Sequence, residues 1–458
     1  MLYSMQTFLV AGLSRSGVSA AEFLRARGAK VYLYDDVEDA AVDEAARKLE
    51  ENGCLRLRGE DALKEGMKNC DVLVLSPGIP VDHSLPVAFR HSGKRVIGEL
   101  ELGALALRAP AVAVTGTNGK TTTVTMLDEI FRADGKKSLA CGNIGKPLTS
   151  CTEELGEDGI AVVEVSSFQL ETLYSLRPHV AVVLNITEDH LNRHYNMENY
   201  VYLKSRLLKN SAESEYAVLN HDDERVRAFA EKTKAKVVFF SLKERVNGGY
   251  ISDGNLCYGG EIIMPASQLP LQGDHNLANA LAAICAAKLM GAKNEAIVSA
   301  LTSFRGVKHR LQNVGQLNGV TFIDDSKSTN VDSAIKAVES LRGETVILLG
   351  GKDKGYSYEP LFAAIKNSGV VHAVIYGENC FRILNAALKS GFTAVTLCRP
   401  FDIAVRVAYL TAKQGQNVLL SPASSSFDMF ANYEERGDRF VQTVAALTEE
   451  YADGNGDS

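Results

Sequence analysis

The stretch AVAVTGTNGKTTT, residues 111–123, has the order of a phosphate-binding loop that lacks one expected glycine. Four apolar residues predict a strand, two glycines predict a turn, and a helix is expected to begin near Thr121. The common pattern G-x-x-x-x-G-K-[ST] would place its first glycine where Val114 stands. In such a loop the backbone N–H groups face a phosphate, Lys120 reaches the terminal phosphates, and Thr121 can bind magnesium. The stretch therefore predicts a nucleotide site, with a glycine turn and an incidental lysine as the alternative.

Apolar β-branched runs alternate with helical stretches along the whole chain, which is typical of α/β proteins with mostly parallel sheets. The 458 residues are enough for about three domains. Segments that separate one series of strands from the next predict domains at 1–100, 101–306 and 307–458. We expect an N-terminal Rossmann-like domain, a central parallel sheet like that of phosphate-loop ATPases, and a C-terminal Rossmann-like domain. The predicted strands are TFLVAG, VYLYD, VLVLSPG, AVAVTG, IAVVEVSS, VAVVLNIT, TVILLGG, HAVIYG, AVTLC and NVLLSP.

The composition of the chain indicates which classes of partner and which cellular compartment to expect. The chain has 49 basic and 56 acidic residues, a formal charge of -7, which provides no electrostatic attraction for nucleic acid. Eight cysteines are scattered singly, as in a cytoplasmic protein with reduced thiols. No apolar run approaches the roughly 18 residues of a membrane span, and the N-terminus lacks the pattern of a signal peptide. We therefore expect a cytoplasmic protein that binds neither nucleic acid nor membrane.

The N-terminal stretch VAGLSRSGVSAAEFLRARGAKVYLYDD follows the strand, turn, helix and strand plan of a dinucleotide site. Gly12 and Gly17 occupy the outer glycine positions, and Asp35 ends the second strand. Ser14 replaces the middle glycine, which normally lets the backbone approach a pyrophosphate, so NAD is disfavoured. A dinucleotide, another nucleotide and a simple tight turn all remain open. Because a separate ATP loop follows, the uridine diphosphate part of a substrate is the preferred ligand, and SPGIP at a later strand end could close over it.

Three residues of the middle segment have side chains suited to metal or phosphate chemistry. Glu164 lies in an apolar strand, where an unpaired carboxylate is costly, and magnesium beside Thr121 is the candidate cation. His190 follows a strand end in TEDH, where ligands gather, and Lys204 lies on a predicted helix. The alternatives are a salt-bridged or partly exposed glutamate, a structural histidine and a solvated lysine.

Several motifs, in this order and spacing, resemble those of the Mur ligases of peptidoglycan synthesis, in particular the members that add D-glutamate. They are GTNGKT in the loop, GNIG at 142–145, EVSSFQLE at 164–171, LNITEDHLNRH at 184–194 and Y-x-x-x-K-S-R at 200–206. The resemblance covers essentially the whole chain. The loop is also similar to that of folylpolyglutamate synthetases, which have no comparable extra N-terminal domain.

The resemblance implies a role for each matching position. ATP would contact Gly116, Thr117, Asn118, Gly119, Lys120, Thr121, Thr122, Asn276, Asn279, Arg310, Asp325 and Lys327, although the two asparagines, three apart on one helix face, could instead be a cap and a surface residue. Two magnesium ions would be held by Thr121, Glu164, His190 and Lys204, the last carrying a carbamate derived from carbon dioxide. The UDP-containing substrate would contact Ser14, Arg15, Ser16, Asp35, Asp36, Ser76, Pro77, Gly78, Gly142 and Asn143. D-Glutamate would contact Thr329, Lys354, Ser426 and Tyr433, the last at a position where other members can have phenylalanine.

The implied reaction is an ATP-dependent ligation by a monomeric enzyme. The carboxylate of UDP-N-acetylmuramoyl-L-alanine would attack the γ-phosphate to give an acyl phosphate, which the amine of D-glutamate would then attack. Lys120, Lys204, His190, Glu164 and Arg310 would be the catalytic residues, acting by alignment and charge neutralisation. A folylpolyglutamate synthetase, a Mur ligase for another amino acid, an NAD-dependent oxidoreductase and a non-catalytic nucleotide switch are the alternatives.

Overall fold

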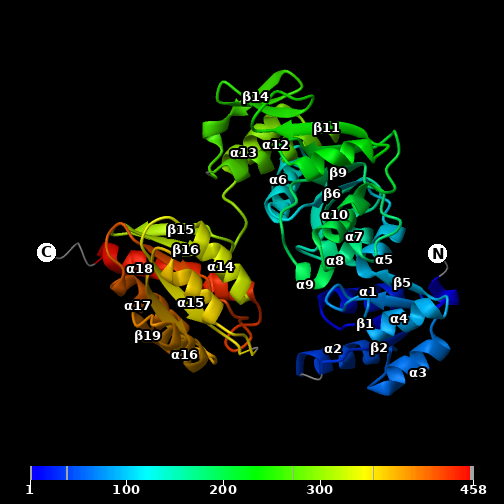
Figure 1. Cartoon of the computed structure of the whole chain (residues 1–458), viewed down its shortest axis with the longest axis horizontal. Coiled ribbons are helices and arrows are strands. Elements are labelled where there is room, and N and C mark those ends of the chain that lie inside the picture. The colour runs from blue at the N-terminus through cyan, green and yellow to red at the C-terminus, as the bar shows by residue number, and fades with distance from the viewer. Residues whose placement is uncertain (1–2, 38–39, 272, 354, 454–458) are drawn as a thin grey trace. The chain divides into compact units, whose positions relative to one another are not determined.

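The computed structural model describes residues 3–37, 40–271, 273–353 and 355–453 (Figure 1). The chain forms two compact units, Met1–Phe304 and Arg305–Ser458. The first unit contains two sheets and the second contains one. All ten strands predicted from the sequence are present, and the α/β fold with parallel-sheet cores is confirmed.

The N-terminal sheet is parallel and has the strand order β3-β2-β1-β4-β5. Strand β1 is central because its apolar residues are buried on both faces, as expected for a parallel sheet covered by helices. The elements are β1 (Thr7–Ala11), α1 (Arg15–Ala26), β2 (Lys30–Tyr34), α2 (Ala40–Glu51), β3 (Leu55–Arg56), α3 (Glu60–Asn69), β4 (Val72–Leu75), α4 (Ser84–His91), β5 (Arg95–Gly98) and α5 (Glu99–Ala106).

The second sheet of this unit has nine strands in the order β14-β13-β12-β11-β10-β9-β6-β8-β7. It is parallel from β7 to β12, and β13 and β14 add an antiparallel extension that the sequence did not predict. The elements are β6 (Ala111–Thr115), α6 (Lys120–Ala133), β7 (Ser138–Gly142), α7 (Leu148–Leu155), β8 (Ile160–Glu164), α8 (Ser167–Leu170), β9 (Val180–Val183), α9 (Leu191–His194), α10 (Met197–Ser205), β10 (Tyr216–Asn220), α11 (Glu224–Arg227), β11 (Lys236–Ser241), β12 (Gly249–Ser252), β13 (Asn255–Tyr258), β14 (Glu261–Pro265), α12 (Asp274–Leu289) and α13 (Asn294–Ser303).

Strand β6 lies inside this sheet, between β8 and β9. Its Val112 and Val114 pack with α6, α12 and α13 on one face, whereas Ala111 and Ala113 pack with α7 and its neighbours on the other. This alternation is the period of two expected of a strand with both faces covered. The loop that follows β6 therefore starts from a rigid, fully buried strand.

Two buried carboxylates of α5 hold the N-terminal and middle sheets of this unit together. Glu99 Oε1 accepts hydrogen bonds from the backbone N–H and the hydroxyl of Thr149, both at 2.8 Å. Glu101 accepts the backbone N–H groups of Tyr174 and Ser175 at 2.8 and 2.9 Å. Burial raises the pKa of Glu99, because the surrounding apolar groups disfavour its charged form.

The second unit has a six-stranded sheet in the order β15-β16-β20-β17-β18-β19, parallel except for β15. Helices α14, α15 and α16 cover one face, and α17 and α18 cover the other. The elements are β15 (Gln312–Leu317), β16 (Val320–Asp324), α14 (Val331–Ser340), β17 (Thr345–Gly350), α15 (Glu359–Lys366), β18 (Val370–Tyr376), α16 (Cys380–Ser390), β19 (Val395–Leu397), α17 (Phe401–Thr411), β20 (Asn417–Leu420) and α18 (Tyr433–Asp453). In the described part of the chain, no helix is long and apolar enough to cross a membrane.

The turn between β1 and α1 depends on close approach of the backbone. A Cβ atom added to Gly17 would lie 1.8 Å from the carbonyl oxygen of Gly12, so only glycine fits. We expect Gly17→Ala to lower the free energy of unfolding by about 3 kcal/mol, because the helix must move away from the strand. Gly78→Ala in the same domain is the matched control, since no atom lies within 4 Å of its added Cβ. Urea denaturation followed by circular dichroism measures both, and equal midpoints would contradict the prediction.

Candidate active site

The loop after β6 begins helix α6 at Lys120, one residue earlier than predicted. Gly119 precedes the helix with φ +84°, a left-handed conformation that favours glycine. The Lys120 ammonium donates to the carbonyl oxygens of Gly116 and Thr117, both at 2.9 Å. The loop thus places a lysine and a helix N-terminus at the end of a central strand, which is the arrangement that binds phosphate.

The segment after β9 holds the other side of this loop. The backbone N–H of Thr117 donates to the Asn185 carbonyl at 2.9 Å, and that of Asn118 donates to Asn185 Oδ1 at 2.8 Å. Asn185 lies at a strand end within the LNITEDHLNRH motif, but no role was predicted for it from the sequence. Asn185 thus holds the loop through both its backbone and its side chain.

Asn279 of α12 packs directly on the loop. A Cβ atom added to Gly119 would lie 2.2 Å from Asn279 Oδ1, and the asparagine is buried. Asn276, one turn earlier, is half-buried. The interpretation of Asn279 as a surface residue is therefore wrong, whereas contact with a nucleotide stays a prediction for both asparagines.

Glu164 ends β8, the neighbour of β6, and is only 2 % exposed. Its Oε2 accepts the Thr121 hydroxyl at 2.8 Å, and its Oε1 accepts the Asn143 side-chain amide at 2.7 Å. These bonds connect the loops that follow β6, β7 and β8. The buried carboxylate is thus satisfied by neutral donors, and neither the salt-bridged nor the partly exposed alternative holds.

Lys204 of α10 is 1 % exposed, so the interpretation as a solvated lysine is wrong. Its ammonium lies 3.5 Å from the Thr115 hydroxyl and 4.8 Å from the centroid of the Tyr200 ring. Burial, together with the positive charge of Lys120, lowers the pKa of Lys204 well below its ordinary value. The site therefore disfavours the charged form of this amine.

His190 lies in the segment between β9 and α9, with φ +53° and a half-exposed side chain. Its ring packs against Phe168, and its Nε2 lies 3.5 Å from Asp189 Oδ2. No group of three or more His, Cys, Asp or Glu side chains is gathered for a metal among the residues that the structure describes. A cation beside Glu164 would need other donors, such as the Thr121 hydroxyl.

The expected contacts of the UDP-containing substrate lie at the carboxyl ends of β1, β2, β4 and β7. Asp35 uses one carboxylate oxygen to accept the Leu13 backbone N–H at 2.6 Å, and Ser76 donates its hydroxyl to the Gly12 carbonyl at 3.0 Å. Asp36 is hydrogen-bonded to Tyr34. These bonds shape the turn itself, and substrate contact stays a prediction for Ser14, Arg15, Ser16, Asp35, Asp36, Ser76, Pro77, Gly78, Gly142 and Asn143.

The remaining predicted residues lie in the second unit. Asp325 accepts the hydroxyls of Ser328 and Ser421, and burial raises its pKa to about 6. The Lys327 ammonium lies 5.5 Å from the centroid of the Tyr433 ring, so these two residues are brought together. Ser426 is buried, Thr329 is half-buried and Arg310 is exposed. Lys354 lies outside the described residues.

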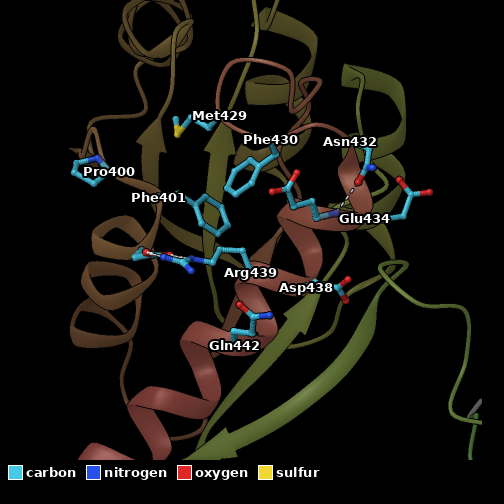
Figure 2. A pocket seen from close by; sticks show the side chains of 11 residues that line it. Pro400, Phe401, Met429, Phe430, Asn432, Glu434, Asp438, Arg439 and Gln442 are labelled. Atoms are coloured by element: carbon cyan, nitrogen blue, oxygen red, sulfur yellow. Dashed lines mark hydrogen bonds and ion pairs between the residues drawn. The ribbon is translucent and has the colours of Figure 1, made fainter.

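A cavity of about 780 Å³ in the second unit lies between α17 and α18 (Figure 2). Phe401 and Phe430 form its apolar wall, with ring centroids 5.1 Å apart. The Arg439 guanidinium donates to both carboxylate oxygens of Asp402, at 2.8 and 2.6 Å. None of the predicted site residues that the structure describes is among the residues that line this cavity.

Arg193 of α9 connects the middle sheet to the N-terminal sheet, a role that was not predicted although Arg193 lies in the LNITEDHLNRH motif. Its guanidinium pairs with Glu171 at 2.6 Å and donates to the carbonyl oxygens of Pro77, Gly78 and Ile79 at 3.0 to 3.5 Å. Both members of the pair are largely buried. The segment that carries His190 is thereby attached to the expected substrate loop at 76–80.

We expect Arg193→Ala to loosen this loop, because it removes three backbone hydrogen bonds and leaves the Glu171 carboxylate buried without its charged partner. Hydrogen exchange at the amides of Ile79 and His83 should accelerate by at least about tenfold. Arg177→Ala is the control, since Arg177 is half-exposed and pairs with Glu215 elsewhere on the unit. Equal exchange in the two variants would show that the arginine does not hold the loop.

Comparisons with known proteins identify the family. Three family models match: Mur ligase MurD-like, N-terminal domain, at residues 6–98; Mur ligase middle domain at 114–287; and Mur ligase, glutamate ligase domain, at 309–424. Relatives named UDP-N-acetylmuramoylalanine–D-glutamate ligase include that of Thermoanaerobacter sp. (strain X514), 40% identical over 96% of this chain and 98% of the relative. That of Pelotomaculum thermopropionicum is 41% identical over 97% and 98%, and that of Streptococcus mutans is 39% identical over 96% and 97%.

Solved structures share the fold. The UDP-N-acetylmuramate-alanine ligase MurC of Thermotoga maritima superposes with a TM-score of 0.57 at 18% identity, covering 96% of this chain and 99% of that one. MurF of Acinetobacter baumannii superposes with a TM-score of 0.53 at 20% identity, covering 92% and 91%. The matching loop, strand ends and full-length identity together show that the chain belongs to the Mur ligase family, in the group whose members are named UDP-N-acetylmuramoylalanine–D-glutamate ligases.

Proposed function

We propose that this chain is a monomeric, cytoplasmic ligase that uses ATP to join D-glutamate to UDP-N-acetylmuramoyl-L-alanine during peptidoglycan precursor synthesis. The observation that carries the proposal is identity of about 40% over nearly the full length to enzymes named for this ligation. The phosphate loop beside the buried Glu164 and Lys204 supports it, because ligation through an acyl phosphate requires phosphoryl transfer from ATP.

The first chemical step is phosphoryl transfer to the substrate carboxylate. A carboxylate oxygen of the L-alanine portion attacks the γ-phosphorus, and the bond to the bridging oxygen breaks to release ADP. Lys120 neutralises the phosphate charge, together with the proposed contacts Arg310 and Lys327 of the second unit. The loop amides and the N-terminus of α6 orient the phosphates, since alignment and charge are the main requirements of this reaction.

The second step forms the amide. The amine of D-glutamate attacks the acyl carbon, the carbon–oxygen bond to phosphate breaks, and the amine loses its proton. We propose Thr329, Lys354, Ser426 and Tyr433 as the contacts of D-glutamate, and Asn276, Asn279 and Asp325 as contacts of the adenosine. Asn143, which is hydrogen-bonded to Glu164, is proposed to contact the UDP-containing substrate near its reacting carboxylate.

Magnesium fits the donor set only with an added oxygen group. The Thr121 hydroxyl and the Glu164 carboxylate lie 2.8 Å apart, and His190 offers a half-exposed imidazole. When bound, the ions would screen the phosphate charges. In its uncharged form, which burial favours, the Lys204 amine can supply the further oxygens: its nitrogen attacks carbon dioxide, an electron pair moves to oxygen, and a proton is released, leaving a carbamate anion.

The substrate assignment is tested by ADP release from the full chain with UDP-N-acetylmuramoyl-L-alanine and ATP. We expect D-glutamate to stimulate release many-fold, whereas L-alanine, L-lysine, meso-diaminopimelate and D-alanyl-D-alanine should not. Stimulation by one of these others would identify a Mur ligase for a different amino acid. Tight NAD binding without ATP turnover would favour an oxidoreductase instead.

The role of Lys204 is tested by substitution. We expect Lys204→Ala to lower turnover by at least about 100-fold, because the oxygens that hold the cation are lost. Lys209→Ala is the control, since Lys209 follows the same helix but is exposed. Circular dichroism verifies the fold of each variant, and removal of carbon dioxide should reversibly inhibit the wild type. Normal turnover of Lys204→Ala would exclude the carbamate.

A further inference from the structure

The carboxyl edge of the second unit's sheet brings together three chain segments that lie far apart in sequence. They follow the adjacent strands β20, β17 and β18, which end at Leu420, Gly350 and Tyr376. Ligands gather at such edges in parallel sheets. The segments after β20 and β17 also carry Ser426 and Lys354, which we proposed above as contacts of D-glutamate.

The side chain of Asn379 lies at the point where these segments meet. Its Oδ1 accepts the Gly351 backbone N–H at 3.0 Å, and its Nδ2 donates to the hydroxyls of Tyr358 and Ser424, both at 2.7 Å. The Tyr358 and Ser424 hydroxyls are themselves 2.9 Å apart. One amide therefore bonds to the β17 segment twice and to the β20 segment once, and every donor of that amide is used.

Because the three side chains are buried, loss of any of these hydrogen bonds would be costly in free energy. Asn379, Tyr358 and Ser424 are 2 %, 1 % and 0 % exposed. A buried polar group that loses its partner pays the full cost of desolvation, so such a network holds one arrangement in preference to others. The backbone N–H of Asn379 also donates to the Gly351 carbonyl at 3.2 Å, which fixes the amide relative to the β17 segment.

The contact between the two loops leaves little freedom for adjustment. The backbone N–H of Lys352 donates to the Ser425 carbonyl at 2.9 Å, and a Cβ atom added to Gly351 would lie 2.2 Å from that same oxygen. A shift of Gly351 is therefore passed directly to the turn at Ser425, which is adjacent to Ser426. The hydrogen bonds of Asn379 with Gly351, Tyr358 and Ser424 therefore join the segments after β17 and β20 at a closely packed contact.

We propose that Asn379 is a positioning residue for the incoming amino acid: its amide holds the segments after β17 and β20 at the separation that the amino-acid site requires. This inference rests on the proposed function, because it takes these two segments as the site of the amine substrate. Asn379 acts through Gly351 and Ser424 and needs no contact with the substrate.

Steady-state kinetics of the full chain test the proposal. We expect Asn379→Ala to raise the KM for D-glutamate by at least about tenfold, while the KM values for ATP and the UDP-containing substrate change by less than about twofold. Asn379→Asp should restore the KM to within about threefold, because one oxygen can still accept the Gly351 N–H and the other can accept both hydroxyls.

Asn417→Ala is the matched control. Asn417 also connects two chain segments through its side-chain amide, donating to the Arg342 carbonyl at 3.1 Å and the Thr345 hydroxyl at 3.3 Å, but at the amino edge of the same sheet. It should leave the KM for D-glutamate unchanged. If Asn379→Ala does not fold, Tyr358→Phe tests the same proposal, because it removes one hydroxyl partner of Asn379 and keeps the ring. It should raise the KM for D-glutamate severalfold.

Two results would overturn the proposal. One is an equal rise in all three KM values, and the other is a loss of kcat with an unchanged KM for D-glutamate; both would indicate a general structural role. Failure of the wild type to use D-glutamate would instead refute the proposed substrate. In that case the same comparison is made with the amino acid that the wild type does use.

Discussion

A carboxylate buried in an apolar strand is the constraint on which the active-site region depends. Glu164 cannot be removed from water without partners, and its partners come from the two neighbouring strand ends, Thr121 after β6 and Asn143 after β7. Three loops that belong to different parts of the sequence are thereby held in one arrangement. The loop that presents Lys120 and the residue proposed to contact the substrate carboxylate share a single anchor.

Burial of Lys204 also disfavours a charged form, in this case that of a cation, and so lowers the pKa of the amine. An amine surrounded by Thr115 and Tyr200, with Lys120 nearby, is disfavoured as a cation. The positive charge of Lys120 on the loop thus adds to the effect of burial on the pKa of Lys204. The same physical effect, desolvation, keeps Glu164 dependent on its hydrogen bonds and disfavours the charged form of Lys204, as the proposed carbamate requires.

Polar groups also connect elements at the edges of the sheets. Arg193 and Glu171 join the His190 segment to the loop at 76–80, and Asn379 joins two loops of the second unit. These residues are buried or nearly so, and no role was predicted for any of them from the sequence, although Glu171 and Arg193 lie within the EVSSFQLE and LNITEDHLNRH motifs. Their effect is to place loops, which are otherwise the most variable parts of an α/β fold, at defined positions over rigid strands.

The amino-acid sequence by itself determined the α/β class, the ten strands, the phosphate loop and the family, because apolar periodicity and the order of short motifs are local properties of the chain. It also indicated Glu164, His190 and Lys204, but left open whether the lysine was solvated. Only the tertiary structure decided that Lys204 is buried, that Asn185 supports the loop, and that Arg193 and Asn379 connect distant segments. The antiparallel extension β13–β14 was missed for a similar reason, since its pairing depends on the partner strand. Burial and hydrogen bonding depend on which residues meet in space, and no pattern within a single segment encodes that.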